Sequence, residues 1–393
     1  MEKILDMSGH AVLGPSSASR WMACTPSARL ELNYPDTSGP AAQEGTLAHE
    51  LGEMIIQYHN KLIKKVEYKE AVERIEANPM FNADMQGHAE DYASFVEERL
   101  AEAKGRTKDA VLQVEAKLNL TEYVPEGFGT GDAVIIADGV MDIIDLKYGK
   151  GVMVFCENNK QMMLYSLGAL REYDFMYDIH TVRMTIYQPR LDNISSFEMS
   201  VSDLRKWAVE ELIPKAKLAF DGVGEFVPGT HCHFCKAKVQ CRALAEENLK
   251  IAKYDFADPI LLADHEISDI LTRAKAFVNW IGSIEDFALL EAIEKGKKWD
   301  GFKLVEGRSN RCYANEEKIA LTLIENGFDE ENIYTKKILG ITAMEKAITK
   351  KTFESLLGKQ IIKPQGKPTL VPASDKRAEW NSIESAINDF SNI

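Results

Sequence analysis

The chain has 393 residues, of which 45% are hydrophobic and 27% are charged, and its formal net charge is −14. This length predicts two or three domains, and the composition is typical of a globular protein rather than a disordered or fibrous one. The sequence contains no run of about 18 apolar residues and no basic-then-apolar start, so we expect no membrane span, no signal peptide and an intracellular, reducing compartment.

The apolar pattern predicts an α/β core over residues 14–250, preceded by a short arm over residues 1–13. Helical spacing predicts helices near 45–62, 86–104, 160–173 and 202–220. Runs of β-branched residues predict strands over 111–119, 131–137, 140–147, 182–188 and 195–200. We therefore expect a central mixed sheet with helices on both faces.

The segment from Asp132 to Lys147 predicts a hairpin that brings carboxylates together. Its sequence, DAVIIADGVMDIIDLK, has two apolar runs around Asp138-Gly139, a dipeptide typical of two-residue turns in which both positions have φ > 0. In that register Asp132 directly faces Asp145, and Lys147 lies on the same side of the sheet. The alternative is an ordinary hairpin with charged residues at its surface.

Two carboxylates this close repel each other and lose hydration in an apolar sheet, and a divalent cation relieves both costs. Bound Mg²⁺ polarises a phosphoryl oxygen and acidifies an attacking water, while Lys147 would position that water or stabilise developing charge. Gln161 and Tyr165 share one face of the predicted helix 160–173. His49 falls early in the first long helix, and Glu115 falls in the first strand. Each of these four has a structural alternative in the core or at its edge.

The ordered motifs G-x-x-D at Gly129–Asp132, D-x-K at Asp145–Lys147 and Q-x-x-x-Y at Gln161–Tyr165 resemble the RecB-type branch of the PD-(D/E)XK nuclease superfamily. The likeness includes phage and prophage RecB-like proteins and the CRISPR-associated and AddB nucleases that carry an iron–sulfur cluster. It covers about residues 14–245. It implies a metal-dependent deoxyribonuclease, expected to be an exonuclease acting on linear single- or double-stranded DNA ends in phage replication or recombination, in the cytoplasm of a bacterial host.

The resemblance also implies which residues bind the metal. His49, Asp132 and Asp145 would be ligands of Mg²⁺ or Mn²⁺, together with the backbone carbonyl of Leu146. Lys147 would be the catalytic lysine.

By the same resemblance, Gln161 and Tyr165 would support the site and the nucleic-acid backbone, and Glu115 corresponds loosely to an acidic residue of some members. The rival interpretation is a non-catalytic nuclease fold that binds DNA or acts as a scaffold subunit of a recombination complex. Partners would be DNA and phage recombination proteins, with homo-oligomerisation left open.

Three of the six cysteines form a C-x2-C-x5-C cluster in HCHFCKAKVQC: Cys232, Cys235 and Cys241. Close spacing in a reducing compartment indicates a metal site rather than disulfides. Cys24, in SSASRWMACTPSARL, is the expected fourth ligand. The spacing alone fits a four-iron four-sulfur cluster and tetrahedral zinc equally, since His231 and His233 are also available.

The iron–sulfur nucleases that this chain resembles place one cysteine before the core and three after it, which favours a [4Fe-4S] cluster over zinc. Such a cluster would join the two ends of the core and would be structural rather than catalytic. Cys156 and Cys312 fit buried free cysteines.

The C-terminal third predicts two further parts. Residues 251–296 contain a long amphipathic helical segment, which either packs on the core or pairs with a second subunit. Residues 297–393 form a small basic module and tail. Residues 295–377 hold 17 Lys/Arg and 11 Asp/Glu, which gives this segment a net charge of +6. The rest of the chain therefore has a net charge of −20. The basic module is a candidate DNA contact, a solvated face or a clasp between subunits.

Overall fold

The computed structural model describes residues 11–35, 39–250, 262–305, 316–326 and 350–357, and the single positions 329, 333, 334, 344 and 361. The chain divides into two compact units, residues 1–287 and residues 288–393. Residues 1–10 of the expected N-terminal arm, Cys312 and most of the basic module lie outside the described residues.

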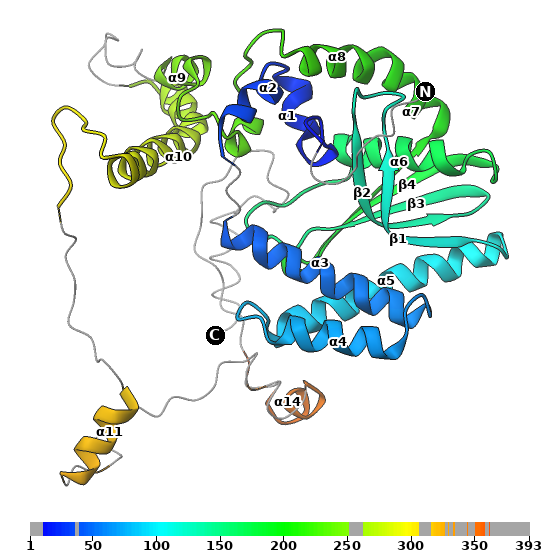
Figure 1. The fold of residues 1–393 in the computed structure, drawn as a ribbon, viewed down its shortest axis with the longest axis horizontal. Coiled ribbons are helices and arrows are strands. Elements are labelled where there is room, and N and C mark those ends of the chain that lie inside the picture. The colour runs from blue at the N-terminus through cyan, green and yellow to red at the C-terminus, as the bar shows by residue number, and fades with distance from the viewer. Residues whose placement is uncertain are drawn as a thin grey trace, which may run out of the picture. The chain divides into compact units, whose positions relative to one another are not determined.

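Five strands form one mixed sheet in the order β1-β2-β3-β4-β5 (Figure 1). They are β1 (Val111–Asn119), β2 (Phe128–Ile136), β3 (Gly139–Leu146), β4 (Ile179–Gln188) and β5 (Asn193–Ser200). Neighbours are antiparallel except β3 and β4, which are parallel because helix α6 (Lys160–Tyr173) crosses over between them. The expected mixed sheet flanked by helices is confirmed, although β4 begins three residues earlier than predicted.

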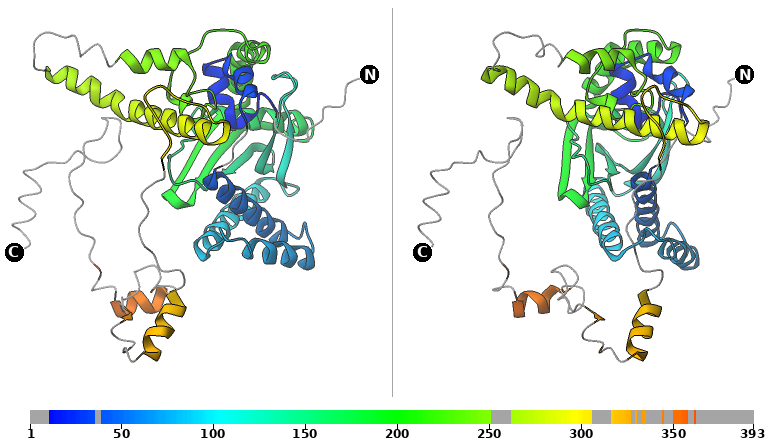
Figure 2. Two further views of the ribbon diagram at one scale, coloured as in Figure 1. Left: turned by 60° about the vertical axis from the view of Figure 1, so that its left-hand side comes forward. Right: turned by 90° about the vertical axis from the view of Figure 1, so that its left-hand side faces the viewer.

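Helices cover both faces of the sheet, as Figures 1 and 2 show. One face packs against α3 (Pro40–His59), α4 (Lys65–Glu76) and α5 (Ala83–Arg106). The other packs against α6, α1 (Ala18–Ala23), α2 (Ser27–Leu30), α7 (Val201–Trp207) and α8 (Ile213–Asp221). Val134 and Ile136 of β2 point into the second layer while Ala133 and Ile135 point into the first. This burial on both sides explains why the stretch Ala133–Ala137 is continuously apolar rather than alternating.

The helix boundaries differ from the predicted ones where local chemistry intervenes. α3 begins at Pro40, and proline is favoured in the first turn of a helix. The helix expected over 202–220 is interrupted by a π-helical turn at Ala208–Leu212. Pro214 follows this turn and has no N–H to donate to the preceding turn. Helix α4 was not predicted.

The turn between β2 and β3 has the predicted register but not the predicted geometry. Ala133 pairs with Ile144 and Ile135 pairs with Asp142, as expected from the sequence. The prediction that both Asp138 and Gly139 have φ > 0 was wrong, because of these two residues only Gly139 has a positive φ, of 78°. The loop before β4 holds the turn instead: Gly139 N donates to Asp178 O at 2.8 Å, and Asp178 N donates to Asp138 Oδ1 at 2.9 Å.

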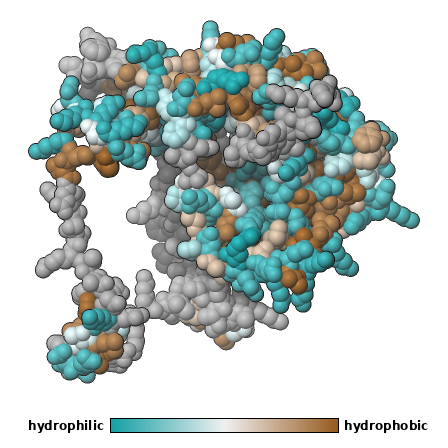
Figure 3. Space-filling model, in the orientation of Figure 1, coloured by the Kyte–Doolittle hydropathy of each residue, from teal (hydrophilic) through white to brown (hydrophobic). Residues whose placement is uncertain are grey.

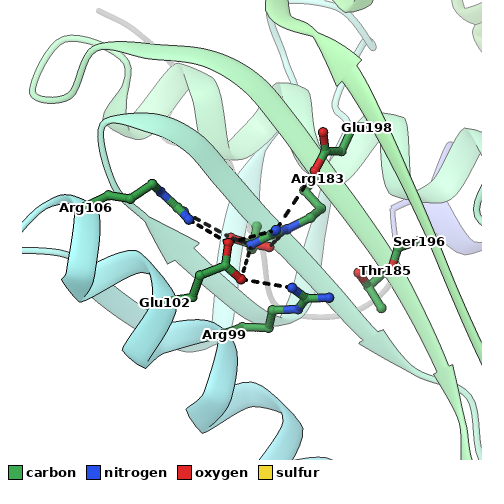
Figure 4. Close-up of polar contacts among 8 residues, drawn as sticks. Arg99, Glu102, Arg106, Arg183, Thr185, Ser196 and Glu198 are labelled. Atoms are coloured by element: carbon green, nitrogen blue, oxygen red, sulfur yellow. Dashed lines mark hydrogen bonds and ion pairs between the residues drawn. The ribbon is translucent and has the colours of Figure 1, made fainter.

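A buried ion network ties α5 to the sheet (Figure 4). Asp142 of β3 is fully buried and accepts hydrogen bonds from Arg183 of β4 at 2.5 and 3.1 Å. Arg183 also donates to both carboxylate oxygens of Glu102 in α5, each at 3.1 Å. Arg99 and Arg106 pair with Glu102 at 2.9 and 2.8 Å. The network therefore fixes the position of α5 along β3 and β4.

The part of the first unit that follows the sheet is helical. It contains the 3₁₀ helix η5 (Thr230–Phe234), α9 (Arg242–Leu249) and the start of α10 (Asp264–Lys295). Helix α10 matches the expected long helix, and Trp280 Nε1 donates to Lys238 O at 3.3 Å. The large apolar side chains of α10 are largely exposed, and Figure 3 shows hydrophobic patches separated by hydrophilic surface on the face drawn.

The described residues of the second unit include the end of α10, α11 (Glu316–Glu325) and α14 (Lys350–Leu357). Among the helices of the described ranges, none is both long and apolar enough to cross a bilayer.

Candidate active site and cysteine recess

Asp132 and Asp145 lie where the pairing of β2 with β3 ends. Ala133 and Ile144 are the last paired residues at this end, and Asp132 and Asp145 follow in the same register. The Asp132 side chain replaces the next backbone contact, since its Oδ2 accepts a hydrogen bond from Leu146 N at 2.7 Å. This contact fixes the carboxylate beside the Leu146 backbone.

Asp132 forms a compact cluster with His49 of α3 and Glu115 of β1. His49 Nδ1 lies 3.2 Å from Asp132 Oδ2, and one ligand-type atom from each of the three residues lies within 4.8 Å of the others. Glu115 leaves the β1–β2 ladder at this point with a φ of 51°, a left-handed conformation that is uncommon for a residue other than glycine. The structure therefore brings together three of the predicted site residues from three different elements.

Two residues that the sequence did not single out line the same recess, Glu53 of α3 and Tyr92 of α5. Glu53 lies one helical turn after His49, so the spacing H-x-x-x-E was a signal that could have identified it. The buried hydroxyl of Tyr92 has no hydrogen-bond partner among the described residues. No sequence pattern indicated Tyr92, because its place depends on how α5 packs against the sheet.

Asp145 lies in a second set of contacts, outside the His49 cluster. Its Oδ1 accepts a hydrogen bond from Gln161 Nε2 at 3.2 Å, and its Oδ2 lies 2.9 Å from Lys147 Nζ. Gln161 Nε2 also donates to the Tyr165 hydroxyl at 3.0 Å. The Q-x-x-x-Y motif thus lies on the face of α6 that covers β3, and it holds the Asp145 carboxylate in one orientation.

The first glycine of G-x-x-D allows close packing beside this set. A Cβ atom at Gly129 would lie 2.7 Å from Pro15 Cγ and 3.0 Å from Tyr165 Cε1. Any side chain at this position would displace Tyr165 or the N-terminal segment. The glycine therefore contributes to the position of Tyr165.

Burial and charge shift the pKa values of the site in opposite directions. Burial alone would lower the pKa of His49, but the charge and hydrogen bond of Asp132 raise it to about 9. Burial alone would raise the pKa of Asp132, but His49 and Lys147 lower it. Burial raises the pKa of Asp145 despite the opposing charge of Lys147. Burial and then the charge of Asp132 raise the pKa of Glu115 to about 7.

Acidic groups outnumber basic ones here. Four carboxylates, those of Glu53, Glu115, Asp132 and Asp145, interact with one another, with His49 and with Lys147. Placing this many carboxylates in a site with little water is unfavourable unless cations compensate them. A bound divalent cation would supply the missing positive charge.

The four cysteines predicted as ligands line a second recess: Cys24, Cys232, Cys235 and Cys241. Cys24 follows α1, two of the others lie in and just after η5, and Cys241 directly precedes α9. Burial raises the pKa of the Cys235 thiol to about 11, so it becomes a thiolate at neutral pH only if a metal stabilises that form. Cys156 is buried in the core beside α6, as expected for a free cysteine.

The spread of these sulfur atoms is larger than a single tetrahedral ion requires. Zn–S bonds of about 2.3 Å put the sulfurs of a zinc site about 3.8 Å apart. Within the described ranges, the only three or more His, Cys, Asp or Glu side chains gathered within 4.8 Å are His49, Glu115 and Asp132. His231 Nε2 lies 2.9 Å from Val227 O, so this nitrogen already has a hydrogen-bond partner.

Direct contacts also join the two ends of the core around this recess. Thr25 Oγ1 donates to Val223 O at 2.6 Å, and Arg29 Nε donates to Phe220 O at 2.5 Å. Lys236 N donates to Glu31 Oε1 at 2.7 Å. Protein contacts therefore join segments about 200 residues apart.

A chain from Eubacterium rectale described as a putative exonuclease is 12% identical, with a TM-score of 0.30, over 66% of this chain and 92% of its own. The protein SSO0001 is 14% identical, with a TM-score of 0.23, over 57% of this chain and 96% of its own. The family described as protein of unknown function (DUF2800) matches residues 10–378. Since that match spans nearly the whole sequence, the chain belongs to the DUF2800 family.

Proposed function

We propose that this chain is a metal-dependent DNA nuclease with a PD-(D/E)XK core of RecB type, acting as an exonuclease. One observation carries the proposal: the motif residues converge at one end of β2 and β3. His49, Glu115 and Asp132 gather within 4.8 Å of one another, and Lys147 and Gln161 hold the neighbouring Asp145.

The donor atoms fit a divalent cation. One imidazole nitrogen and two carboxylates lie close together, and the four carboxylates of the site outnumber His49 and Lys147. Oxygen ligands suit Mg²⁺ and Mn²⁺, and we assign Asp145 and the Leu146 carbonyl as further ligands by resemblance to the RecB-type nucleases. The bound ion would polarise a phosphoryl oxygen and lower the pKa of a water molecule beside it.

Lys147 would supply positive charge to the reacting phosphate. Burial alone would lower its pKa, but Asp145 and Asp132 raise it, so the side chain remains an ammonium at neutral pH. It can therefore donate a hydrogen bond to a phosphate oxygen and stabilise the charge that develops there. Gln161 keeps Asp145 from rotating away, because it donates to Asp145 Oδ1 and to Tyr165 at once.

We also propose that Cys24, Cys232, Cys235 and Cys241 hold a [4Fe-4S] cluster that stabilises the fold. All four line one recess, and their spread is larger than four ligands of one zinc ion need. Zinc is the alternative. Linear DNA ends as the substrate and a role in phage replication or recombination rest on the resemblance to RecB-like proteins.

The test is digestion of end-labelled linear and closed circular DNA, single- and double-stranded, with Mn²⁺, Mg²⁺ or EDTA. Lys147→Ala is compared with wild type, and Lys69→Ala, which changes an exposed lysine of α4, is the matched control. We expect metal-dependent loss of linear DNA only, abolished by Lys147→Ala and unaffected by Lys69→Ala.

Equal activity of Lys147→Ala and wild type would refute the assignment of this site. Cutting of closed circles would contradict exonuclease action while leaving the nuclease assignment intact. No digestion by folded protein with full metal content would favour a DNA-binding or scaffold role.

A further inference from the structure

Two buried polar atoms in the cysteine recess have no hydrogen-bond partner among the described residues, Arg20 Nε and Ser27 Oγ. Both residues line the recess together with the four cysteines. Ser27 is only 2% exposed, so bulk water does not reach its hydroxyl. A buried donor without a partner loses its hydrogen bonds to water and gains none in return, so native proteins rarely contain one. The recess is therefore shaped for an acceptor that meets these two donors.

The other contacts of Arg20 hold its Nε in place. Arg20 Nη2 pairs with Glu31 at 2.5 Å, and Nη1 donates to Phe234 O at 3.4 Å. Glu31 in turn accepts from Lys236 N at 2.7 Å. The guanidinium is thus held through both terminal nitrogens, and among the described residues its buried Nε–H has no partner.

The positions of both donors relative to Cys24 support the same acceptor. Arg20 lies four residues before Cys24 in α1, and Cys24 N donates to Arg20 O at 2.8 Å. Ser27 begins α2, three residues after Cys24, and its N–H donates to Cys24 O at 3.0 Å. In the later cysteine segment, Cys241 is the N-cap of α9, and the dipole of this helix also favours negative charge at its N-terminus.

We propose that Arg20 Nε–H and Ser27 Oγ–H donate hydrogen bonds to sulfur atoms of the cluster held by the four cysteines, and that they raise its reduction potential. This inference rests on the proposed [4Fe-4S] cluster. Cluster thiolates and sulfides are anionic acceptors, and hydrogen bonds to them stabilise the reduced form, which carries one more negative charge. Arg20 and Ser27 are thus positioning and tuning residues, not ligands.

The test is a potentiometric titration of the anaerobically purified full chain, followed by electron paramagnetic resonance of the reduced cluster. Ser27→Ala removes the hydroxyl, Ser27→Thr retains it, and Ser166→Ala is the control. Ser166 is also buried, but its hydroxyl already donates to Met162 O at 2.9 Å and does not line the recess.

We expect Ser27→Ala to keep full iron and sulfide content while the reduction equilibrium shifts about tenfold toward the oxidised form, which is 59 mV for one electron. Ser27→Thr and Ser166→Ala should match wild type. Resonance Raman spectra of wild type in H₂O and D₂O give a second readout without any substitution, since a hydroxyl bonded to the cluster shifts its Fe–S bands on deuteration.

An unchanged midpoint potential in a fully loaded Ser27→Ala protein would overturn this inference and leave the cluster assignment standing. If Ser27→Ala failed to fold, the Raman spectra of wild type would decide instead. Fe–S bands that do not shift in D₂O would overturn the inference. Wild type that contains zinc and no iron would instead remove the proposed cluster, and this inference with it.

Discussion

Replacing Arg183 by methionine should destabilise the first unit more than most single substitutions. Arg183 provides both hydrogen bonds that the structure gives to the fully buried Asp142 carboxylate, at 2.5 and 3.1 Å. Without it, the nearest remaining cation is Arg106, whose Nη2 lies 3.9 Å from Asp142 Oδ2. Methionine matches the arginine side chain as far as Nε, so the change keeps the apolar stem and removes the charged end.

The size of the effect follows from the burial of Asp142. Removing one partner of a buried ion pair costs about 3–5 kcal/mol, because the other charge remains in the interior without compensation. For a unit of this size, each kcal/mol corresponds to about 2–4 °C in Tm. We therefore expect Arg183→Met to lower Tm by roughly 6–20 °C.

Thermal unfolding followed by circular dichroism measures this shift, and a double-mutant cycle isolates its cause. Adding Asp142→Asn to Arg183→Met removes the stranded charge and should recover at least about 1 kcal/mol. Arg99→Met is the control, since Arg99 pairs directly with the more exposed Glu102 and acts on Asp142 only through its charge, so the change should cost less than about 1 kcal/mol. If Arg183→Met melted like Arg99→Met, or if Asp142→Asn brought no recovery, the network would not stabilise the fold as argued.

Other substitutions probe the packing, the charges and the two candidate sites. Gly168→Ala should destabilise by about 1–3 kcal/mol in urea titrations, because its Cβ would lie 2.8 Å from Leu118 Cβ, whereas Gly87→Ala in α5 meets nothing within 4 Å and should not destabilise. Hydrogen bonds from Arg183 lower the pKa of Glu102 to about 2, below its ordinary 4.5, so its contribution is present above pH 4.5 and lost as the pH falls toward 2. The stability difference between wild type and Glu102→Gln should therefore shrink between pH 6 and pH 3, and a constant difference would contradict this origin. Asp145→Ala should reduce DNA cutting at least about 10³-fold while the circular dichroism spectrum stays that of a folded protein. Cys232→Ser should lower both metal content and Tm, and unchanged values of both would refute a structural metal site.

The sequence predicted the sheet well because its strands carry strong local signals. The Asp138-Gly139 dipeptide between two apolar runs predicted the β2–β3 register, and the structure has that register. The turn geometry could not be predicted, since it depends on hydrogen bonds between this turn and Asp178, forty residues after Asp138. Pro214 was a sequence signal for the break at Ala208–Leu212. The break was not predicted because a π-helical turn keeps the segment helical, so the spacing of its apolar residues still indicates one helix.

The candidate site shows the same division between local and tertiary information. Gln161 and Tyr165 share a helix face, and that local fact was enough to group them. His49, Glu115 and Asp132 meet because α3 packs over the sheet and Glu115 adopts a positive φ, and neither is encoded in a short motif. Tyr92, Arg20 and Ser27 were missed because only the folded chain shows that their polar atoms are buried and unpartnered.

The hydrogen bonds between the first helices and the segment after the sheet also constrain synthesis of the protein. Trp21 and Met22 of α1 are almost fully buried in the layer that includes α8, which is made almost 200 residues later. Until α8 and the cysteine segment leave the ribosome, α1 exposes these side chains and has no completed binding surface. The beginning of the core is thus among the last parts to fold, and a chain that stops before residue 213 lacks α8 and three of the four cysteines.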